Sequence, residues 1–595
     1  MSNFEAIRQQ MFETIAEESQ KQIDSEIGLI RPSGHTLSFG AHSQASGSDV
    51  RSSAEFAVAL AMTRHDDLAW KALGAVLDHQ DINPRSFTYG NFFWHSHWKT
   101  AWDPNAVSFI APCLCYVLRH RGDSMPDALK SGLREGLSLA IEGLNAHRAT
   151  WEYTNIALLN MASKLLIGDV LDDPRARDLS YWDWEEWRNH SARLGAITEY
   201  NSVCYTYVQI HALAMMLTCN SASEQLLREV REAMRHLITA AVFDYHPAIG
   251  RITGPQSRAY EGDRRLRGHS AMDWVMHLTA SAPEPQRRQP LWLGVPIGPE
   301  DVLPEAADLS LPRTTLASTQ DFSRTNYLAP DFALGSISRG GVRFGHGVPF
   351  FLTYKSASSR CTIPIQTTRP PAGHFSCQRG GTLLTGCTWL IDPNSDHDNL
   401  SPAWWKGRFT GLNTGRPHEL VRDQQFAPEF VAELGIAEEI RLFDGDGKAI
   451  SDIDRQNLRG TVILETESVR VGLRFFTTDG SDARLVLSQD ADGEMALTAR
   501  GTREGVEVNP LETALFLGFL LHVSPRTSGV EVATLAQGVS ALDISVEQSH
   551  RRGWKVSASL DGIDLKVNAP AHTGYFYSAH GAGVTPNQWA VSLEE

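Results

Sequence analysis

Through the first half of the chain, apolar side chains recur three and four positions apart, the spacing of a helix that buries one face. Residues 103–120 show the pattern most clearly, with apolar side chains at Val107, Ile110, Ala111, Leu114, Val117 and Leu118. The pair Asp103-Pro104 precedes them, an order typical of a helix start. Ser52 and Glu55 form a capping-box pattern ahead of another apolar run. Similar segments cover 53–81, 104–120, 125–146, 155–168, 202–219, 223–243 and 269–280.

Segments repeated at roughly 35–50 residues predict stacked helical hairpins, as in an α-solenoid or an α/α toroid. From their number we expect residues 1–285 to form an α/α toroid, that is, an incomplete helical barrel. The proline-rich stretch 281–315 has no such period and predicts a linker, which we place at 286–315.

In residues 316–595 the period becomes two, as in a strand with one buried face. Val469, Val471, Leu473 and Phe475 alternate with smaller or charged residues and predict a half-buried strand. A run from Trp554 to Leu560 turns at Asp561-Gly562 into a second strand. Many strands with close turns and few helices between them predict an antiparallel β-sandwich, so the fold class is α+β and multidomain.

The amino-acid composition limits the kinds of molecule that the protein is expected to bind. The 595 residues are 42% apolar and 21% charged, as in a globular chain, and Asp plus Glu outnumber Lys plus Arg by 70 to 54. A net charge of −16 argues against nucleic-acid and anionic-membrane partners. The start of the chain shows no secretory signal and no long apolar run predicts a membrane span, so we expect a cytoplasmic protein. The seven cysteines form no CxxC pair, which favours buried free thiols.

No nucleotide-binding, serine-hydrolase or zinc-protease motif is present, so candidate chemistry comes from four aromatic and polar segments. The first, 89–103, repeats tryptophan every four residues at Trp94, Trp98 and Trp102. Asn91, His95 and His97 lie between them. One interpretation is a helix that packs its tryptophans into the core. The other is a sugar-binding wall, because flat indoles stack on pyranose rings while His and Asn bond the hydroxyls.

The second and third segments place polar groups at helix starts. In 151–160, Trp151 precedes Thr154, a predicted cap, so Asn155 falls in the first turn, where an amide can bind a substrate carboxylate. In 197–211, Glu199 is followed by Asn201 and Ser202, either of which can cap the next helix. Tyr205 then lies in the first turn, where the positive end of the helix dipole favours phenolate, the form that acts as a base.

The fourth segment, 250–263, breaks the helical pattern at Gly254-Pro255 and carries Arg258 and Tyr260. Arginine binds carboxylates through two parallel hydrogen bonds, so this loop is a candidate carboxylate clamp. The alternative is a surface ion pair between Arg258 and Glu261.

These groups together suit β-elimination from a uronate sugar. Asn155 and Arg258 would neutralise the carboxylate and so acidify the neighbouring C5 proton. Tyr205, Tyr260 or His95 would remove that proton, and one tyrosine could also protonate the leaving oxygen. Trp94, Trp98, Asn91, Trp151, Glu199 and Asn201 are the predicted substrate-binding residues. No nucleophile, metal or cofactor is needed, and the predicted partner is an acidic oligo- or polysaccharide.

The same pattern resembles the α/α-toroid polysaccharide lyases, among them the heparinase II/III, alginate exolyase and chondroitin AC or hyaluronate lyase groups. The stretch from Glu199 to Tyr205 is similar to the sequence ahead of the catalytic tyrosine in the exolyases, and Asn155 matches their carboxylate-binding asparagine. The loop up to Arg258 is similar to the arginine loop of the hyaluronate type. The exolyase Asn-His pair is Asn-Ile here, which leaves His95, or His346 and His374 of the β-part, as the catalytic histidine.

Two other classes stay open. A glycoside hydrolase, including an unsaturated uronyl hydrolase, needs two carboxylates facing a sugar, and Asp103, Glu152, Glu199 and Asp273 are available. A non-catalytic carbohydrate-binding protein would bind sugar without turnover, and a sugar isomerase would share the barrel.

Overall fold

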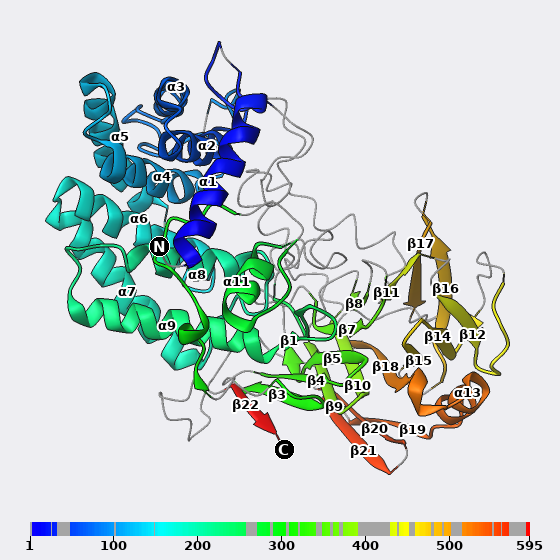
Figure 1. Ribbon diagram of the computed structural model, residues 1–595. Helices are drawn as coiled ribbons and strands as arrows, with labels where there is room; N and C mark the ends of the chain where they lie inside the picture. The colour runs from blue at the N-terminus through cyan, green and yellow to red at the C-terminus, as the bar shows by residue number, and fades with distance from the viewer. Residues whose placement is uncertain are drawn as a thin grey trace.

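A computed structural model describes residues 3–594 with gaps at 25, 32–47, 100, 102, 148, 258–269, 286–289, 305–308, 319–321, 341–347, 358–360, 368–372, 391–428, 437–439, 452–457, 478–480, 491–492, 501–513, 550–552, 561 and 570–590. Helices occupy the first part of the chain and antiparallel sheets the second, so the predicted fold class is confirmed (Figure 1). The exact domain boundaries stay a prediction.

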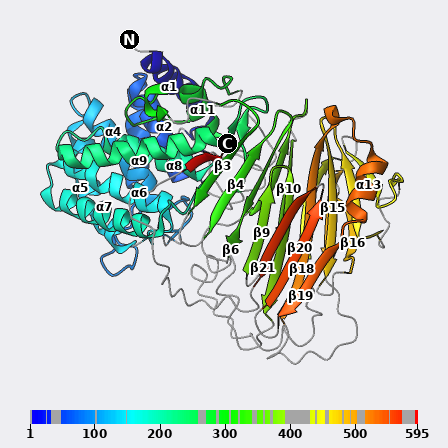
Figure 2. The same ribbon diagram turned by 90° about the horizontal axis from the view of Figure 1, so that it is seen from below.

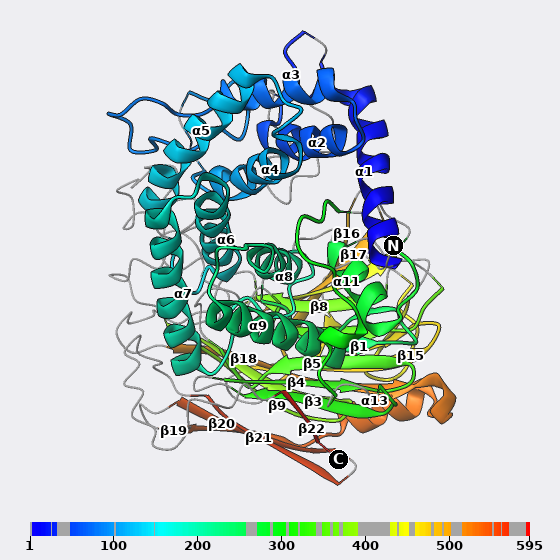
Figure 3. The same cartoon turned by 60° about the vertical axis from the view of Figure 1, so that its left-hand side comes forward.

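The described helices of the first part pair into hairpins around an open ring (Figure 3). The inner helices are α2 (Val50–Met62), α4 (Ala106–Arg121), α6 (Thr154–Leu171) and α8 (Tyr205–Met216). The outer helices are α3 (Asp66–Leu77), α5 (Asp127–Ala146), α7 (Pro174–Leu194) and α9 (Glu224–Phe243). Helix α1 (Asn3–Gln22) packs on α2 at one end of the ring, and α11 (Ala271–Ala280) packs on α8 and α9 at the other.

The inner helices are apolar on nearly all sides because neighbours surround them, whereas α5 and α9 bury only one face. The predicted start at residue 223 agrees with the structure, in which Ser223 caps α9 with its hydroxyl. Other predictions differ: Asn105, not Asp103, precedes α4, and Tyr153, not Thr154, precedes α6. Asp49, not Ser52, caps α2, and its carboxylate accepts the N–H of Ser52. Residues 89–103 form turns and isolated bridges in their described part, so the tryptophan spacing there does not reflect a helix.

The linker region follows the inner wall of the ring. Residues 290–295, which we call the strap, run along α8. The hydroxyl of Tyr207 donates to the carbonyl of Leu291 at 3.1 Å, and the N–H of Val295 donates to the carbonyl of Ala214 at 3.0 Å. Gly294 is required there, since an added Cβ would lie 2.4 Å from the Cβ of Ala214. The strap therefore belongs physically to the helical part.

Two large antiparallel sheets form the sandwich, and Figure 2 shows them side by side beyond the helices. The larger has the order β13-β16-β17-β11-β8-β7-β5-β4-β3-β22, and the smaller β12-β14-β15-β18-β10-β9-β6. The larger contains β13 (Leu458–Arg459), β16 (Arg484–Gln489), β17 (Glu494–Arg500), β11 (Glu429–Ile436), β8 (Thr362–Thr367), β7 (Phe350–Tyr354), β5 (Phe332–Ile337), β4 (Ser323–Leu328), β3 (Arg313–Ser318) and β22 (Val591–Glu594). The smaller contains β12 (Arg441–Asp444), β14 (Thr461–Glu465), β15 (Val469–Thr477), β18 (Ala514–Pro525), β10 (Thr382–Leu390), β9 (Gly373–Arg379) and β6 (Arg339–Gly340).

Apolar side chains from both sheets meet in one core, which includes Phe350, Phe430, Phe475 and Phe519. A third layer covers the outer face of the smaller sheet: α13 (Val532–Ser540) with the hairpin strands β19 (Ile544–Ser549), β20 (Gly553–Leu560) and β21 (Ile563–Ala569). For this reason β15 is buried on both faces rather than half-buried.

A short hairpin joins the two parts. Strands β1 (Tyr245–His246) and β2 (Arg251–Ile252) follow α9 directly and lie against the larger sheet. Arg313 at the start of β3 donates to the carbonyls of Phe243 and Tyr245, and the ring of His246 bonds the carbonyl of Ala329 at 2.6 Å. The two parts also approach each other closely at Gly335 of the sandwich, where an added Cβ would lie 2.4 Å from the Cα of Gly254.

All seven cysteines are free thiols, and six of them are buried. None of the helices in the described part of the chain combines the length and the apolar character needed to cross a bilayer.

Candidate active site

The inner helices begin at one end of the ring, and hydrogen bonds connect successive starts. At α2, the N–H of Val50 donates to the carbonyl of Trp94 at 2.9 Å, and Asp49 forms a backbone bridge with His95. At α4, Asn91 accepts the N–H of Val107 at 3.1 Å and donates to the carbonyl of Pro104 at 2.7 Å. The segment 91–95 therefore connects the first two helix starts.

The connection continues from α4 to α6. The side-chain amide of Asn105, the residue before α4, donates to the hydroxyl of Tyr153 at 3.1 Å, and Tyr153 immediately precedes α6. The ring of His147 bonds the other side of the Asn105 amide at 2.7 Å, and the carbonyl of His147 accepts from Asn160 at 3.0 Å. Asn160 thus satisfies a carbonyl at the end of α5, and the side chains of Asn105 and Tyr153 join the start of α4 to that of α6.

Asn155 and Glu199 form the centre of this end of the ring. Both are fully buried, and Asn155 lies in the first turn of α6, as the sequence predicts. Its side-chain nitrogen lies 2.9 and 2.7 Å from the two carboxylate oxygens of Glu199, and its backbone N–H donates to one of them at 2.7 Å. Glu199 thus places a negative charge at the start of α6, where the helix dipole stabilises it. The side-chain carbonyl oxygen of Asn155 is buried without a hydrogen-bond partner among the described residues.

Tyr205 is the first residue of α8 and is 8% exposed. The hydroxyl of Ser202 accepts its backbone N–H at 3.2 Å, as expected for a capping residue. One turn later on the same face of α8, the side chain of Gln209 donates to the backbone carbonyl of Glu199 at 3.0 Å. Gln209 thus joins α8 to Glu199, and Glu199 is joined to α6 through Asn155, so Tyr205 belongs to a helix that is bonded to the Asn155–Glu199 pair.

Arg258 and Tyr260 lie outside the described residues, as do Trp102 and His346. The loop is described up to Ser257, whose backbone N–H donates to the carbonyl of Tyr200 at 3.1 Å. The described end of the arginine loop is therefore attached to the segment that leads into α8.

The remaining predicted residues lie nearer α2 and α4. Trp94 is 8% exposed and packs against Phe109, with ring centroids 5.7 Å apart, so its indole belongs to the core. His95 is buried, and its ring lies 5.2 Å from that of Trp98 in an edge-on arrangement. Trp98 and Trp151 are partly buried against the core. Asn91 could bind a substrate only by releasing its contacts at the start of α4.

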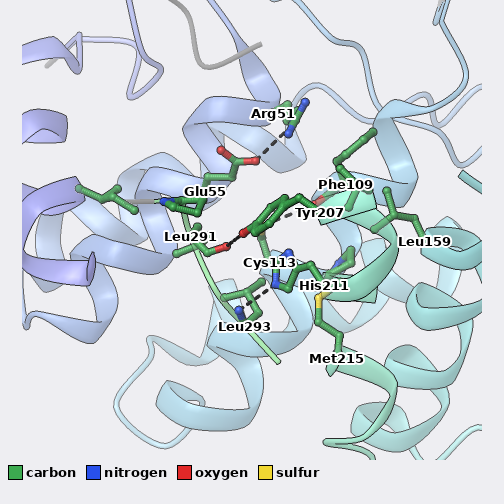
Figure 4. Close-up of a pocket in the computed structure, with 14 residues that line it drawn as sticks. Arg51, Glu55, Phe109, Cys113, Leu159, Tyr207, His211, Met215, Leu291 and Leu293 are labelled. Atoms are coloured by element: carbon green, nitrogen blue, oxygen red, sulfur yellow. Dashed lines mark hydrogen bonds and ion pairs between the residues drawn. The ribbon is translucent and has the colours of Figure 1, made fainter. Parts of the chain in front are cut away.

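Beneath the helix starts, one turn into the ring, lies a cavity of about 100 Å³ that the sequence did not predict (Figure 4). Arg51 and Glu55 of α2 form an ion pair of 3.2 Å at its wall, and the guanidinium of Arg51 lies 4.0 Å from the centroid of the Phe109 ring. Tyr207 and His211 of α8 also line it, and each is hydrogen-bonded to the strap, Tyr207 to Leu291 and His211 to Leu293 (Figure 4). The i,i+4 pair Arg51–Glu55 within an apolar helix was the one available sequence signal.

Burial shifts the pKa values of two side chains that line the cavity, Tyr207 and His211. It raises the pKa of Tyr207 above the ordinary value and lowers the pKa of His211 from 6.5 to about 3. His211 is therefore neutral at physiological pH, and its Nε2 accepts the N–H of Leu293 in the strap at 2.9 Å. Within the described residues, no group of three or more His, Cys, Asp or Glu side chains is arranged to hold a metal ion.

A family model described as a domain of unknown function (DUF8769) matches residues 9–291. No curated protein matches the sequence. A crystal structure of heparinase III is similar at 11% identity and a TM-score of 0.40, covering 87% of this chain and 82% of that one.

Two structures of a heparinase III gene product, one with methylated lysines, are similar at 10% and 9% identity, each with a TM-score of 0.37. They cover 92% and 94% of this chain and 90% and 89% of their own. Heparinase III belongs to the groups that the sequence is expected to resemble. This likeness assigns no residue of this chain a role.

Proposed function

We propose that this protein is a lyase that cleaves a uronate-containing oligo- or polysaccharide by β-elimination at the end of the ring where the inner helices start. Tyr205 acts as base and then as acid, Asn155 and Arg258 bind the uronate, and the substrate is acidic. The observation that carries the proposal is the position of Tyr205 at the start of α8, a helix that Gln209 joins to Glu199 of the buried Asn155–Glu199 pair.

The reaction moves one proton and needs no redox partner. The Tyr205 phenolate removes the C5 proton, and the electrons pass into the neighbouring carboxylate, which is stabilised by positive charge. The bond from C4 to the glycosidic oxygen then breaks, leaving a C4–C5 double bond. The proton held by Tyr205 passes to the leaving oxygen, which returns the phenolate for another turnover. Tyr260 and His95 remain the alternative bases.

The contacts of Asn155 suggest how the binding of the uronate is divided between Asn155 and Arg258. The side-chain nitrogen of Asn155 is directed at Glu199, while its carbonyl oxygen has no donor among the residues that the structure describes. A sugar hydroxyl supplies such a donor, whereas a carboxylate does not. We therefore assign the carboxylate charge mainly to Arg258 and the orientation of the sugar mainly to Asn155.

The test is the ultraviolet absorbance of the conjugated double bond, measured with purified protein on a panel of uronate oligosaccharides. Tyr205→Phe is expected to lower kcat by at least about 100-fold, since it removes the acid–base group. Tyr181→Phe is the matched control: its hydroxyl accepts the N–H of Ser223 on the outer side of the ring, and activity should persist. Absence of an absorbing product on every substrate, or a fully active Tyr205→Phe protein, would refute the proposal.

The hydrolase alternative predicts the opposite pattern. Its products carry no conjugated double bond, and activity would then depend on a carboxylate. A Glu199→Gln protein without activity, together with an active Tyr205→Phe protein, would favour a hydrolase.

A further inference from the structure

Asp244, the residue after α9, accepts hydrogen bonds from both parts of the molecule. It is 1% exposed. From the helical part, the side chain of Asn201 donates to Oδ2 at 2.8 Å. From the sandwich, Thr315 and Asn326 donate to Oδ1 at 2.6 and 3.0 Å, and the guanidinium of Arg324 lies 3.3 Å from Oδ2. A buried carboxylate with several charge-assisted partners holds them in defined positions.

Asn201 has a backbone conformation that needs such support. Its φ of 50° lies in the left-handed region, which is unfavourable for a residue with a side chain. The second contact of its side-chain amide is the carbonyl of Thr253 at 3.0 Å, and Thr253 is in turn bonded to Asp244 through its backbone and its hydroxyl. Asn201 is 6% exposed and both contacts are internal, so its amide is used for structure rather than presented to solvent.

The left-handed turn at Asn201 sets the start of α8. The next residue, Ser202, is fully buried, and it accepts the N–H of Tyr205 through its hydroxyl and that of Thr206 through its carbonyl at 2.9 Å. A shift of Asn201 therefore moves the first turn of α8 and the phenol that it carries. The sandwich reaches the same turn a second way, because Arg324 of β4 lies 4.8 Å from the ring of Tyr200.

From these contacts we infer that Asp244 and Asn201 are a positioning pair for Tyr205, through which the sandwich fixes the phenol at the helix starts. The kinetic part of this inference rests on the proposed function, and the structural part does not. Asn201, predicted from the sequence to bind substrate, acts instead through Tyr205.

Two variants test the pair. Asn201→Gly keeps the left-handed backbone, since glycine adopts it without strain, and removes only the amide. Asp244→Asn keeps the shape of the side chain but replaces one carboxylate oxygen, a hydrogen-bond acceptor, by an amide nitrogen, which would face the donor groups of its neighbours. Asp183→Asn is the control, because Asp183 is also ion-paired, with Lys164 at 2.7 Å, but connects α7 to α6.

The direct measurement is fluorine NMR of protein labelled with 3-fluorotyrosine, in which the Tyr205 resonance among 13 tyrosines is assigned by its absence from Tyr205→Phe. We expect Asn201→Gly and Asp244→Asn to shift or broaden this resonance, and Asp183→Asn to leave it in place. An unchanged Tyr205 resonance in folded Asn201→Gly and Asp244→Asn proteins overturns the inference.

Kinetics add the second readout. Both variants should lower kcat by about 10- to 100-fold, with a smaller change in KM, because the phenol is displaced while the groups that bind the sugar remain. A rise in KM without a fall in kcat would contradict a positioning role. If the wild-type protein shows no elimination at all, the proposed function fails, and the fluorine resonance alone decides whether Asp244 and Asn201 position Tyr205.

Discussion

Protonation of His211 should release the strap from the inner wall of the ring. In the folded protein its neutral Nε2 accepts the N–H of Leu293, and burial lowers its pKa from 6.5 to about 3. An imidazolium has no acceptor nitrogen, so protonation breaks this bond and places a charge in a largely apolar cavity.

The direction and the size of the change in stability follow from the pKa of His211 in the unfolded chain and in the folded protein. Because the unfolded chain takes up the proton near pH 6.5 and the folded protein only near pH 3, this contribution to stability is complete above pH 6.5 and is lost as the pH falls toward 3. Between pH 7.5 and pH 5 the loss is about 2 kcal/mol for one group. This is an upper value, because part of the ring faces the cavity.

Hydrogen exchange of peptides that contain Leu293 measures the opening of the strap. In the wild type, protection corrected for the intrinsic rate should fall by up to about 30-fold between pH 7.5 and pH 5, the equivalent of about 2 kcal/mol. His211→Gln is the comparison, since its side-chain carbonyl can accept the same N–H but does not titrate. Equal pH dependence in the two proteins would show that His211 does not control the strap.

Two further predictions concern stability. Glu199→Gln removes the charge that accepts from Asn155 and should lower the free energy of unfolding by about 1–3 kcal/mol, measured by denaturant unfolding of the helical circular-dichroism signal; an unchanged midpoint would contradict this capping role. Gly294→Ala places a Cβ 2.7 Å from the carbonyl carbon of Ala214 and should cost about 1–3 kcal/mol and increase exchange in the strap. Normal protection there would mean that the strap adapts without cost.

The sequence predicted those helices whose apolar period reflects a single buried face or full burial. It did not predict α7, in which charged residues dominate and burial rests largely on Trp184 and Trp187. It also joined α2 and α3 into one segment, because both face the core. The break between them depends on Arg64 at a φ of 66°, where neither glycine nor proline signals a turn.

The strand from Val469 shows a second reason for error. Its alternation predicts one solvent-facing side, but α13 lies against that side, and an added Cβ at Gly472 would be 2.7 Å from Val539. A covering helix that begins only at Val532 cannot be inferred from the local period of this strand. Alternation records which face prefers the core, and tertiary packing decides whether the other face is also covered.

The candidate site was predictable where capping determines it and unpredictable where partners are distant. Asn201 and Ser202 ahead of an apolar run were enough to place Tyr205 in a first turn. The pairing of Asn155 with Glu199, 44 residues later, depends on how α6 and α8 pack. Likewise, the contact of Asn201 with Asp244 depends on the meeting of the helical part and the sandwich.

The four carboxylates that a hydrolase could use already have hydrogen-bond or ion-pair partners within the protein, which affects the choice between hydrolysis and elimination. A hydrolase needs two carboxyl groups facing the sugar. Glu199 directs both oxygens at Asn155, and Asp273 closes a capping box with Ser270 at the start of α11. Asp103 accepts the N–H of Asn105 at 2.9 Å, and Glu152 lies 3.6 Å from His190. Each candidate carboxylate thus has a local partner that a sugar would have to displace. A hydrolase at this end of the ring would therefore have to break two of these local contacts before a pair of carboxylates could face the sugar.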